Sequence, residues 1–319
     1  MPLKERQLIA RIRSRSGRLR SGAGVGIGDD CAVLRLPPGE EVLVTTDFSL
    51  EGVHFRREWH PPESVGHRCL ARGLSDIAAM GGTPRAAFLS LALPSELPQR
   101  WVDRFVTGFL ELASRYSVPL SGGDTAQSPN GVFADVVVIG SVPAGEAILR
   151  SEAKPGDLIY VTGSLGRPLA DLNLLFAGKK LRPAEHRKTF YPEPRVAAGQ
   201  FLRTRKLTSA MIDISDGLST DLSHICEESG VGAVIYADAV PVARRSERAL
   251  EFALHGGDEY ELLFTARPTH RLPKQVRGVT ITRIGEIVRG RQMKLILSGG
   301  ASQPLMARGW EHFSAVDSS

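Results

Sequence analysis

The residues best suited to chemistry in this sequence are aspartates that stand beside glycine, serine or threonine in six short segments. The segments read GIGDD, TTD, LSD, SGGDT, IDISDG and GGDEYE, at residues 26–30, 45–47, 74–76, 121–125, 212–217 and 256–261. A carboxylate at the end of a buried strand is costly unless it caps a helix or binds a cation. Six such segments in one chain indicate bound cations, because clustered carboxylates repel one another.

The donor types indicate which cation these segments would bind. The six segments supply oxygen donors and contain no histidine or cysteine, a composition that selects Mg²⁺, Mn²⁺ or Ca²⁺ over Zn²⁺. Because Mg²⁺ usually shares its coordination shell with substrate phosphates, several aspartates predict a polyphosphate held by more than one ion. The neighbouring glycines would let backbone amides approach the phosphate oxygens.

Three common nucleotide-binding classes do not fit these segments. The GxxxxGK[ST] loop is absent, and so are the HRD and DFG motifs of protein kinases. The VGIGDD segment at residues 25–30 differs from the dinucleotide fingerprint, because Asp29 and Asp30 would face the pyrophosphate.

The elements that must position these segments alternate between strand and helix. We expect strands at residues 41–46, 86–93, 118–121, 132–142, 157–162, 210–214, 231–237, 260–266 and 279–287. We expect helices at residues 3–13, 62–80, 99–116, 165–177, 194–204 and 217–229. This alternation predicts an α/β (α+β) fold. The aspartates are expected at the ends of the strands.

A stretch rich in proline, glycine and charge at residues 143–156 predicts a junction between two domains. Residues 1–146 would form an N-terminal domain, and residues 147–319 would form a C-terminal α/β domain. A chain of 319 residues is long enough for two such domains.

The charge balance favours an anionic partner. The net charge is +5, with a basic cluster near the start that comprises Arg11, Arg13, Arg15, Arg18 and Arg20. No aromatic residues are interleaved with these arginines, so a stacking surface for single-stranded nucleic acid is poorly supported. We therefore expect a polyphosphate partner and no nucleic acid.

The spacing of the cysteines and the hydropathy of the sequence argue against further classes of protein. Cys31, Cys69 and Cys226 are widely spaced, which predicts neither a zinc site nor a disulfide framework. No signal sequence and no run of about 18 apolar residues is present. We expect a cytoplasmic protein with no membrane partner.

Taken in order, the motifs resemble those of thiamine-monophosphate kinases from about residue 3 to residue 313. They read GIGDDCAVL, TTDFSLEGVHF, LSDIAAMGGTP, GGDT, IDISDGL and GGDEYELLF. The resemblance implies a two-domain fold shared with aminoimidazole-ribonucleotide synthetase, in which the N-terminal halves of two subunits pair into a barrel-like homodimer. It implies that ATP phosphorylates thiamine monophosphate to thiamine diphosphate by direct in-line transfer, with several Mg²⁺ ions. It also implies that residues 1–146 bind ATP and magnesium and form the dimer, and that residues 147–319 complete the ATP and substrate site.

The resemblance also implies roles for residues of this sequence. Metal ligands fall on Asp30, Thr45, Thr46, Asp47, Asp76, Asp124, Asp213 and Asp216. Of these, Asp30, Asp213 and Asp216 are also the expected catalytic residues. ATP contacts fall on Gly123, Asp124, Arg150 and Ser215. Substrate contacts fall on His54, Glu261 and Trp310.

This sequence departs from the family pattern at two places. Gly73 stands where the family usually has asparagine, and GGDEYE stands where it usually has GGEDYE.

Two alternatives remain open. The first is another ATP-dependent enzyme of the same superfamily, such as an aminoimidazole-ribonucleotide synthetase. Selenophosphate synthetases and hydrogenase-maturation factors are disfavoured, because Cys31 lies inside the DDCA segment and the sequence ends in VDSS. The second is a non-catalytic nucleic-acid-binding protein that uses the basic cluster. It leaves the aspartates unexplained, because carboxylates without metal repel phosphate.

Overall fold

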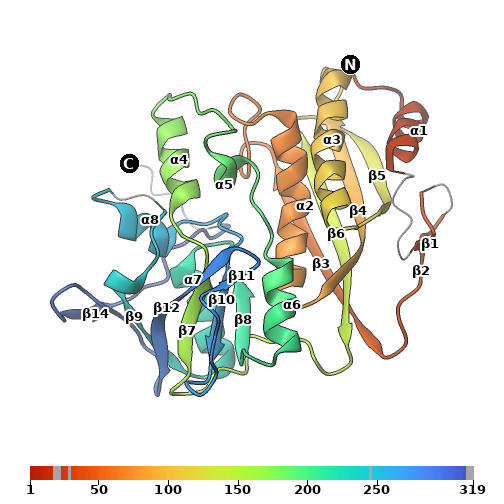
Figure 1. The fold of residues 1–319 in the computed structure, drawn as a ribbon. Helices are drawn as coiled ribbons and strands as arrows, with labels where there is room; N and C mark the ends of the chain where they lie inside the picture. Colours follow the sequence, from red (N-terminus) through yellow and green to blue (C-terminus); the bar gives the residue numbers. More distant parts are fainter. Residues whose placement is uncertain (17–22, 28–29, 244–245, 314–319) are drawn as a thin grey trace. The chain divides into compact units, whose positions relative to one another are not determined.

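A computed structural model describes residues 1–16, 23–27, 30–243 and 246–313 (Figure 1). The chain forms two compact units. The first comprises Met1–Ala147 and Lys180–Val196, and the second comprises Ile148–Lys179 and Ala197–Ser319. The change between the units, after Ala147, lies inside the proline- and glycine-rich stretch of the sequence. Among the described residues, no helix is both long and apolar enough to cross a membrane.

The first unit is built on a four-stranded sheet with the order β3–β6–β4–β5. Its strands are β3 (Glu40–Leu50), β4 (Thr83–Pro94), β5 (Leu120–Ser128) and β6 (Phe133–Pro143). Strand β6 runs antiparallel to β3 and β4, and β5 runs parallel to β4. Two short strands, β1 (Ala23–Val25) and β2 (Val33–Leu34), pair separately.

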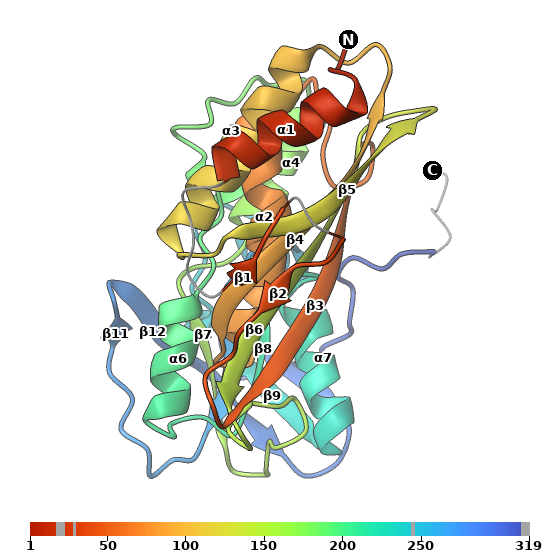
Figure 2. The same cartoon turned by 90° about the vertical axis from the view of Figure 1, so that its right-hand side faces the viewer.

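The helices of the first unit cover one face of this sheet. They are α1 (Glu5–Ser16), α2 (Pro62–Ala79), α3 (Gln99–Arg115) and α5 (Arg187–Phe190). Helix α2 packs against β3, β6 and β4, α3 packs on α2, and α1 lies at the β5 edge (Figure 2). Helices α2 and α3 approach closely at glycines. A Cβ added at Gly66 would lie 2.0 Å from the Phe105 carbonyl oxygen, so any larger residue would force the helices apart.

The second unit is built on an eight-stranded sheet with the order β14–β13–β9–β12–β7–β10–β8, and β11 pairs with β12. Neighbouring strands are antiparallel except β13 and β9, which are parallel. The strands are β7 (Leu158–Thr162), β8 (Ala210–Asp213), β9 (Gly232–Tyr236), β10 (Leu262–Ala266), β11 (Gln275–Val276), β12 (Val279–Val288), β13 (Met293–Ile296) and β14 (Ser302–Pro304).

The helices of the second unit include α7, which positions most of the predicted site residues of this unit. The helices are α4 (Arg167–Phe176), α6 (Val196–Thr204), α7 (Leu218–Ser229), α8 (Ala249–His255) and a short 3₁₀ helix, η1 (Ala237–Ala239). Helix α7 packs against β8, β9 and β10. The short elements α5, α8, β11, β13 and β14 were not predicted from the sequence.

The expectation that the aspartates lie at strand ends is wrong at three positions. Asp47 lies inside β3, where it pairs with Val136, and Asp124 lies inside β5. Asp76 lies on helix α2. The expectation is correct for Asp213, the last residue of β8. Strands β3 and β5 continue through their polar residues because β6 and β4 supply hydrogen-bonding partners along their length.

Candidate active site

In the first unit, strand β3 presents Thr45 and Asp47 to helix α2. Successive side chains of a strand point to opposite faces, so these two residues share the face that α2 covers. Thr45 Oγ1 donates a hydrogen bond to Asp76 Oδ2 on α2. Asp47 lies near the buried thiol of Cys69, and burial raises the pKa of that thiol to about 12. The carboxylates of Asp47 and Asp76 and the hydroxyl of Thr45 are therefore gathered between β3 and α2.

The opposite face of the same sheet carries Thr46 and Asp124. Thr46 Oγ1 donates to Asp135 Oδ1 on β6 at 2.8 Å. The register pairs Asp135 with Ser90 of β4, and Ser90 with Asp124 of β5, so all four side chains lie on one face. The structure thus divides the predicted oxygen ligands of this unit between the two faces of the sheet.

Gly123, a predicted ATP contact, is required by the backbone of β5. It has a φ of +148°, and an added Cβ would lie 1.9 Å from the Leu89 carbonyl oxygen. Asp124 is exposed, and its Oδ1 accepts the Thr125 amide at 2.8 Å. Thr125 Oγ1 is buried and forms no hydrogen bond with a described residue. An oxygen ligand or cation at this strand would satisfy that hydroxyl.

Two further predicted residues of the first unit have simple local surroundings. His54 is half-buried in the turn after β3, and its Nδ1 accepts the Leu50 amide at 3.0 Å. Its carbonyl accepts a hydrogen bond from the buried Arg68 at 3.2 Å. Asp30 is exposed. Its sequence neighbours Gly28 and Asp29 lie outside the described residues.

In the second unit, the turn between β8 and α7 is held by a carboxylate that sequence reasoning missed. Asp221 is 1% exposed, and its Oδ2 accepts the amides of Ser215, Asp216 and Gly217 at 3.1, 3.2 and 3.0 Å. Burial raises the pKa of Asp221 well above its ordinary value, and the charges of Asp213 and Asp216 raise it further. The sequence marks Asp221 only as an acidic residue in the first turn of a predicted helix, which is a common feature of helices.

The GGDEYE segment lies against this turn. Asp258 N donates to the Ser215 carbonyl at 2.7 Å, and Tyr260 N donates to the Ile214 carbonyl at 2.9 Å. Glu261, the predicted substrate contact, is 1% exposed and accepts the Thr162 hydroxyl at 2.7 Å. Asp258 is half-buried and is the more accessible acid of the segment.

The C-terminal segment also reaches the same turn. Trp310 N donates to the Asp216 carbonyl at 2.9 Å, and Gly309 N donates to Thr220 Oγ1 at 3.0 Å. The Trp310 side chain is 53% exposed and stands edge-on to His312 at 5.6 Å between ring centroids. About half of Trp310 is therefore exposed to solvent beside the Asp216 backbone.

Arg150, a predicted ATP contact, is exposed. Its carbonyl accepts the Ser229 hydroxyl at 2.7 Å, which fixes its backbone beside the end of α7. Its guanidinium forms no hydrogen bond or ion pair with another described residue, so the charge is available to an anion.

One histidine lies beside Asp216 in the structure, although the six aspartate segments contain none. It is His224 on α7, and Asp221 completes the group. Donor atoms of the three residues lie within 4.8 Å of one another. Within the described residues this is the one group of such donors with metal-ligand spacing. The crowded carboxylates of this unit fit a bound cation, because a positive charge would offset their repulsion.

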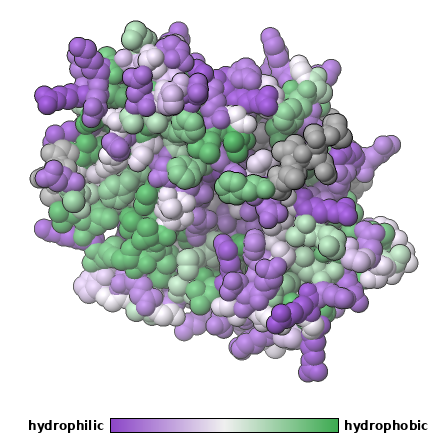
Figure 3. Space-filling view, turned by 180° about the vertical axis from the view of Figure 1, so that it is seen from behind, coloured by the Kyte–Doolittle hydropathy of each residue, from purple (hydrophilic) through white to green (hydrophobic). Residues whose placement is uncertain are grey.

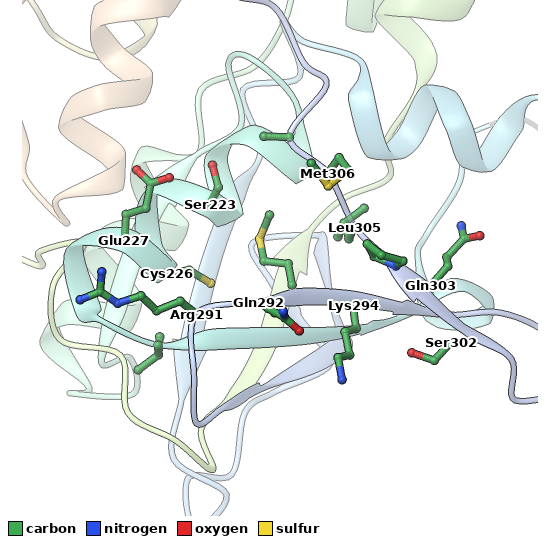
Figure 4. Close-up of a pocket in the computed structure, with 14 residues that line it drawn as sticks. Ser223, Cys226, Glu227, Arg291, Gln292, Lys294, Ser302, Gln303, Leu305 and Met306 are labelled. Atoms are coloured by element: carbon green, nitrogen blue, oxygen red, sulfur yellow. The ribbon is translucent and has the colours of Figure 1, made fainter.

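A separate cavity of about 650 Å³ lies between α7 and the β13–β14 region (Figure 4). Its lining includes Ser223, Cys226 and Glu227 of α7, which occupy a different face of the helix from Asp221. Burial raises the pKa of Cys226 to about 12, so its thiol stays protonated and is a poor nucleophile. None of the predicted site residues lines this cavity.

The basic cluster at the N-terminus is partly engaged within the first unit. Arg11 binds both carboxylate oxygens of Asp103 on α3, at 2.5 and 2.8 Å. Arg15 donates to the Asp103 carbonyl and to the Thr107 hydroxyl. Arg18 and Arg20 lie outside the described residues. These contacts weaken the nucleic-acid alternative, because two of the arginines stabilise the packing of α1 on α3.

Comparison with known proteins first defines the class. Residues 28–142 match the family model of AIR synthase related protein, N-terminal domain. Residues 154–298 match that of AIR synthase related protein, C-terminal domain. The expected fold class is confirmed: the chain has the two-domain architecture of the AIR synthase-related proteins.

Comparison with individual relatives identifies the family within this class. The chain is 37% identical to thiamine-monophosphate kinase of Salmonella typhimurium, over 98% of this chain and 99% of the relative. The structure of thiamine-monophosphate kinase from Stenotrophomonas maltophilia K279a matches with a TM-score of 0.82 and 36% identity, over 92% of this chain and 97% of that chain. AaThiL complexed with AMPPCP and TMP matches with a TM-score of 0.77 and 29% identity, over 98% and 99%. The chain belongs to the thiamine-monophosphate kinase family.

Proposed function

We propose that this protein transfers the γ-phosphate of ATP to thiamine monophosphate, giving thiamine diphosphate and ADP. The observation that carries the proposal is the meeting of three distant segments at residues 214–216 of the second unit. The GGDEYE segment binds the Ile214 and Ser215 carbonyls, and Trp310 binds the Asp216 carbonyl. An acidic loop, an aromatic face and a carboxylate-rich turn thus surround one short stretch of backbone.

Phosphoryl transfer requires positioning and charge neutralisation more than a protein nucleophile. Bound magnesium would neutralise and orient the phosphate oxygens. The residues that would hold it are Asp30, Thr45, Thr46, Asp47, Asp76 and Asp124 in the first unit and Asp213 and Asp216 in the second. Gly123, Asp124, Arg150 and Ser215 would contact ATP, with the exposed guanidinium of Arg150 pairing with a phosphate.

The acceptor has a cationic thiazolium ring, which suits the second unit. The exposed indole of Trp310 can receive a cation, an interaction that contributes about 0.5–2 kcal/mol. The acidic segment that contains Glu261 would supply the counter-charge, with Asp258 as its more accessible carboxylate. His54 of the first unit is a further proposed substrate contact.

The test is ADP formation from ATP and Mg²⁺ with a panel of phosphorylated acceptors. We expect ADP with thiamine monophosphate, identification of thiamine diphosphate as the second product, and no turnover in excess EDTA. ADP formation with a different acceptor alone would favour another reaction of the superfamily. Full turnover in EDTA would remove the role of magnesium while leaving the acceptor established.

We also propose that the protein is a homodimer through the first unit. The sheet face opposite α2 carries exposed apolar side chains: Val42 is 52% exposed, Val44 65%, Phe48 62% and Phe133 39%. Figure 3 shows apolar side chains gathered over the strands of this unit. A contiguous apolar surface of this kind is typical of a protein interface, and a second copy of the same sheet is a self-complementary cover.

Light scattering at micromolar concentration tests the dimer. We expect twice the chain mass for the wild-type protein and the chain mass for Val44→Asp, which places a charge in the apolar face. Val53→Asp, at an exposed position beyond the end of β3, is the matched control. A wild-type protein with the mass of one chain would refute the proposal.

A further inference from the structure

The three residues Asp216, Asp221 and His224 form a group whose chemistry differs from that of an all-oxygen magnesium site. The turn before α7 supplies Asp216, and the first two turns of α7 supply the other two. Residues three apart on a helix share a face, so α7 directs Asp221 and His224 to the same side. Their donor atoms and that of Asp216 lie within 4.8 Å of one another.

Two of these side chains have donor atoms that no other described residue satisfies. The backbone amides of residues 215–217 all bind Asp221 Oδ2, and Oδ1 accepts no hydrogen bond from a described residue. The Asp221 side chain is nevertheless almost fully buried. His224 is half-buried, and its imidazole forms no hydrogen bond or ion pair with a described residue. Asp221 Oδ1 and the His224 imidazole are therefore both available to one shared cation.

The amide contacts also fix the direction of the Asp221 carboxylate. Three hydrogen bonds to one oxygen hold the group in place and leave the other oxygen for a ligand. Such outer contacts orient a metal ligand and add to its affinity. They also tie Asp221 to the backbone of Asp216, so two of the three donors belong to one rigid turn.

We propose that Asp216, Asp221 and His224 form a divalent-metal site that takes Mn²⁺ or Zn²⁺ in preference to Mg²⁺. An imidazole nitrogen together with carboxylates suits transition metals, whereas Mg²⁺ favours oxygen ligands and retains its waters. Three protein donors leave positions for water or a phosphate oxygen. The inference deepens the proposed function, because Asp216 is also a proposed magnesium ligand, but binding itself requires neither ATP nor turnover.

Direct metal binding to the full chain tests this site. Metal-free wild-type protein is titrated with Zn²⁺ against a chromophoric chelator, with Mn²⁺ by electron paramagnetic resonance, and with Mg²⁺ by competition for bound Mn²⁺. We expect His224→Asn to weaken Zn²⁺ and Mn²⁺ binding about 10- to 100-fold. Its effect on Mg²⁺ should be under about 3-fold, because Mg²⁺ gains little from an imidazole.

A spectroscopic readout keeps the test independent of activity. Bound Mn²⁺ in the wild-type protein should show ¹⁴N couplings in electron spin-echo measurements, from a directly coordinated imidazole, and His224→Asn should abolish them. His270→Asn is the matched control, because His270 lies in the same unit but contacts the Leu207 carbonyl instead. Wild-type Mn²⁺ without ¹⁴N coupling would overturn the proposal even if His224→Asn failed to fold.

The outcome separates this inference from the proposed function. A wild-type protein that binds Zn²⁺ and Mn²⁺ no more tightly than Mg²⁺, but is an active kinase in Mg²⁺, would refute the mixed-ligand site alone. A site with ¹⁴N coupling in a protein that does not phosphorylate thiamine monophosphate would refute the proposed function alone. Equal Zn²⁺ affinity of the His224→Asn and wild-type proteins would also refute the site.

Discussion

Gly73, in the interior of α2, provides a sharp test of how the first unit positions its carboxylates. A Cβ added there would lie 2.6 Å from Val138 Cγ2 and 3.2 Å from Val138 Cβ on strand β6. Val138 is fully buried, and its branched side chain has few rotamers into which it could move. An alanine at residue 73 must therefore displace α2 or β6.

The expected effect is a difference between two opposing contributions. Alanine in place of glycine in a helix interior should stabilise by about 0.5–1 kcal/mol. Overpacking a close-packed core typically costs about 1–3 kcal/mol. We expect Gly73→Ala to lower the free energy of unfolding by about 1 kcal/mol. Because Asp76 lies one turn further along α2, the variant should also require more Mg²⁺ for half-maximal activity.

A second variant identifies the cause. Val138→Ala removes the methyl groups that alanine at residue 73 would meet, and should itself cost about 2 kcal/mol through the cavity it leaves. In that background Gly73→Ala should become neutral or stabilising. The coupling free energy between the two sites should be at least about 1 kcal/mol, within the range for residues in contact.

Urea denaturation of the four proteins measures this coupling. Tryptophan fluorescence reports on the first unit through Trp59 and Trp101. Equal changes in the free energy of unfolding on Gly73→Ala in both backgrounds would refute a steric conflict between residues 73 and 138. In that case the close approach of α2 to β6 would not explain why glycine occupies position 73.

Three further perturbations test other parts of the argument. Asp213→Asn should lose most of its turnover and, in EDTA, melt at a higher temperature, because it removes a charge that raises the pKa of Asp221; near-normal turnover contradicts this. Trp310→Ala should raise KM for thiamine monophosphate about 3- to 30-fold and leave KM for ATP unchanged; a parallel change in both constants would indicate a packing role. His67 is buried, with Nε2 2.7 Å from the Pro192 carbonyl oxygen, and burial lowers its pKa to about 4. The unfolded state then binds more protons, so the free energy of unfolding should fall by about 3 kcal/mol as the pH drops from about 6.5 to 4. His67→Gln should remove this pH dependence from the urea midpoint, and an unchanged dependence would exclude His67 as its source.

The long elements were predictable because their apolar spacing extends over many residues. Helices α2 and α3 and strand β6 were predicted to within one or two residues. The ends of β3 and β5 were not, because aspartate and glycine are depleted in strands and were read as stops. The whole of β3 pairs with the whole of β6, so tertiary hydrogen bonding overrides this local preference through Asp47.

The two faces of the sheet explain why the grouping of these candidate residues could not be predicted from the sequence. The TTD segment reads as a single cluster of donors, but a strand alternates its side chains. Thr45 and Asp47 therefore face α2, while Thr46 faces Asp135 on the other side. Only the position of α2, determined by buried contacts far along the chain, distinguishes these two environments.

His224 is a second residue whose neighbours could not be predicted from the sequence, and it affects the choice of metal. From the sequence, the aspartate segments contain no histidine, which favours magnesium over softer metals. However, Asp216, Asp221 and His224 are separated by five and three residues, and the second interval is a helical one. Helix α7 begins at Leu218, so its first two turns lie beside the loop that carries Asp216. Asp221 and His224 are three residues apart on the side of α7 that faces this loop, and their donor atoms lie within 4.8 Å of that of Asp216. The choice of metal therefore depends on where the helix begins, and a motif read residue by residue does not contain that information.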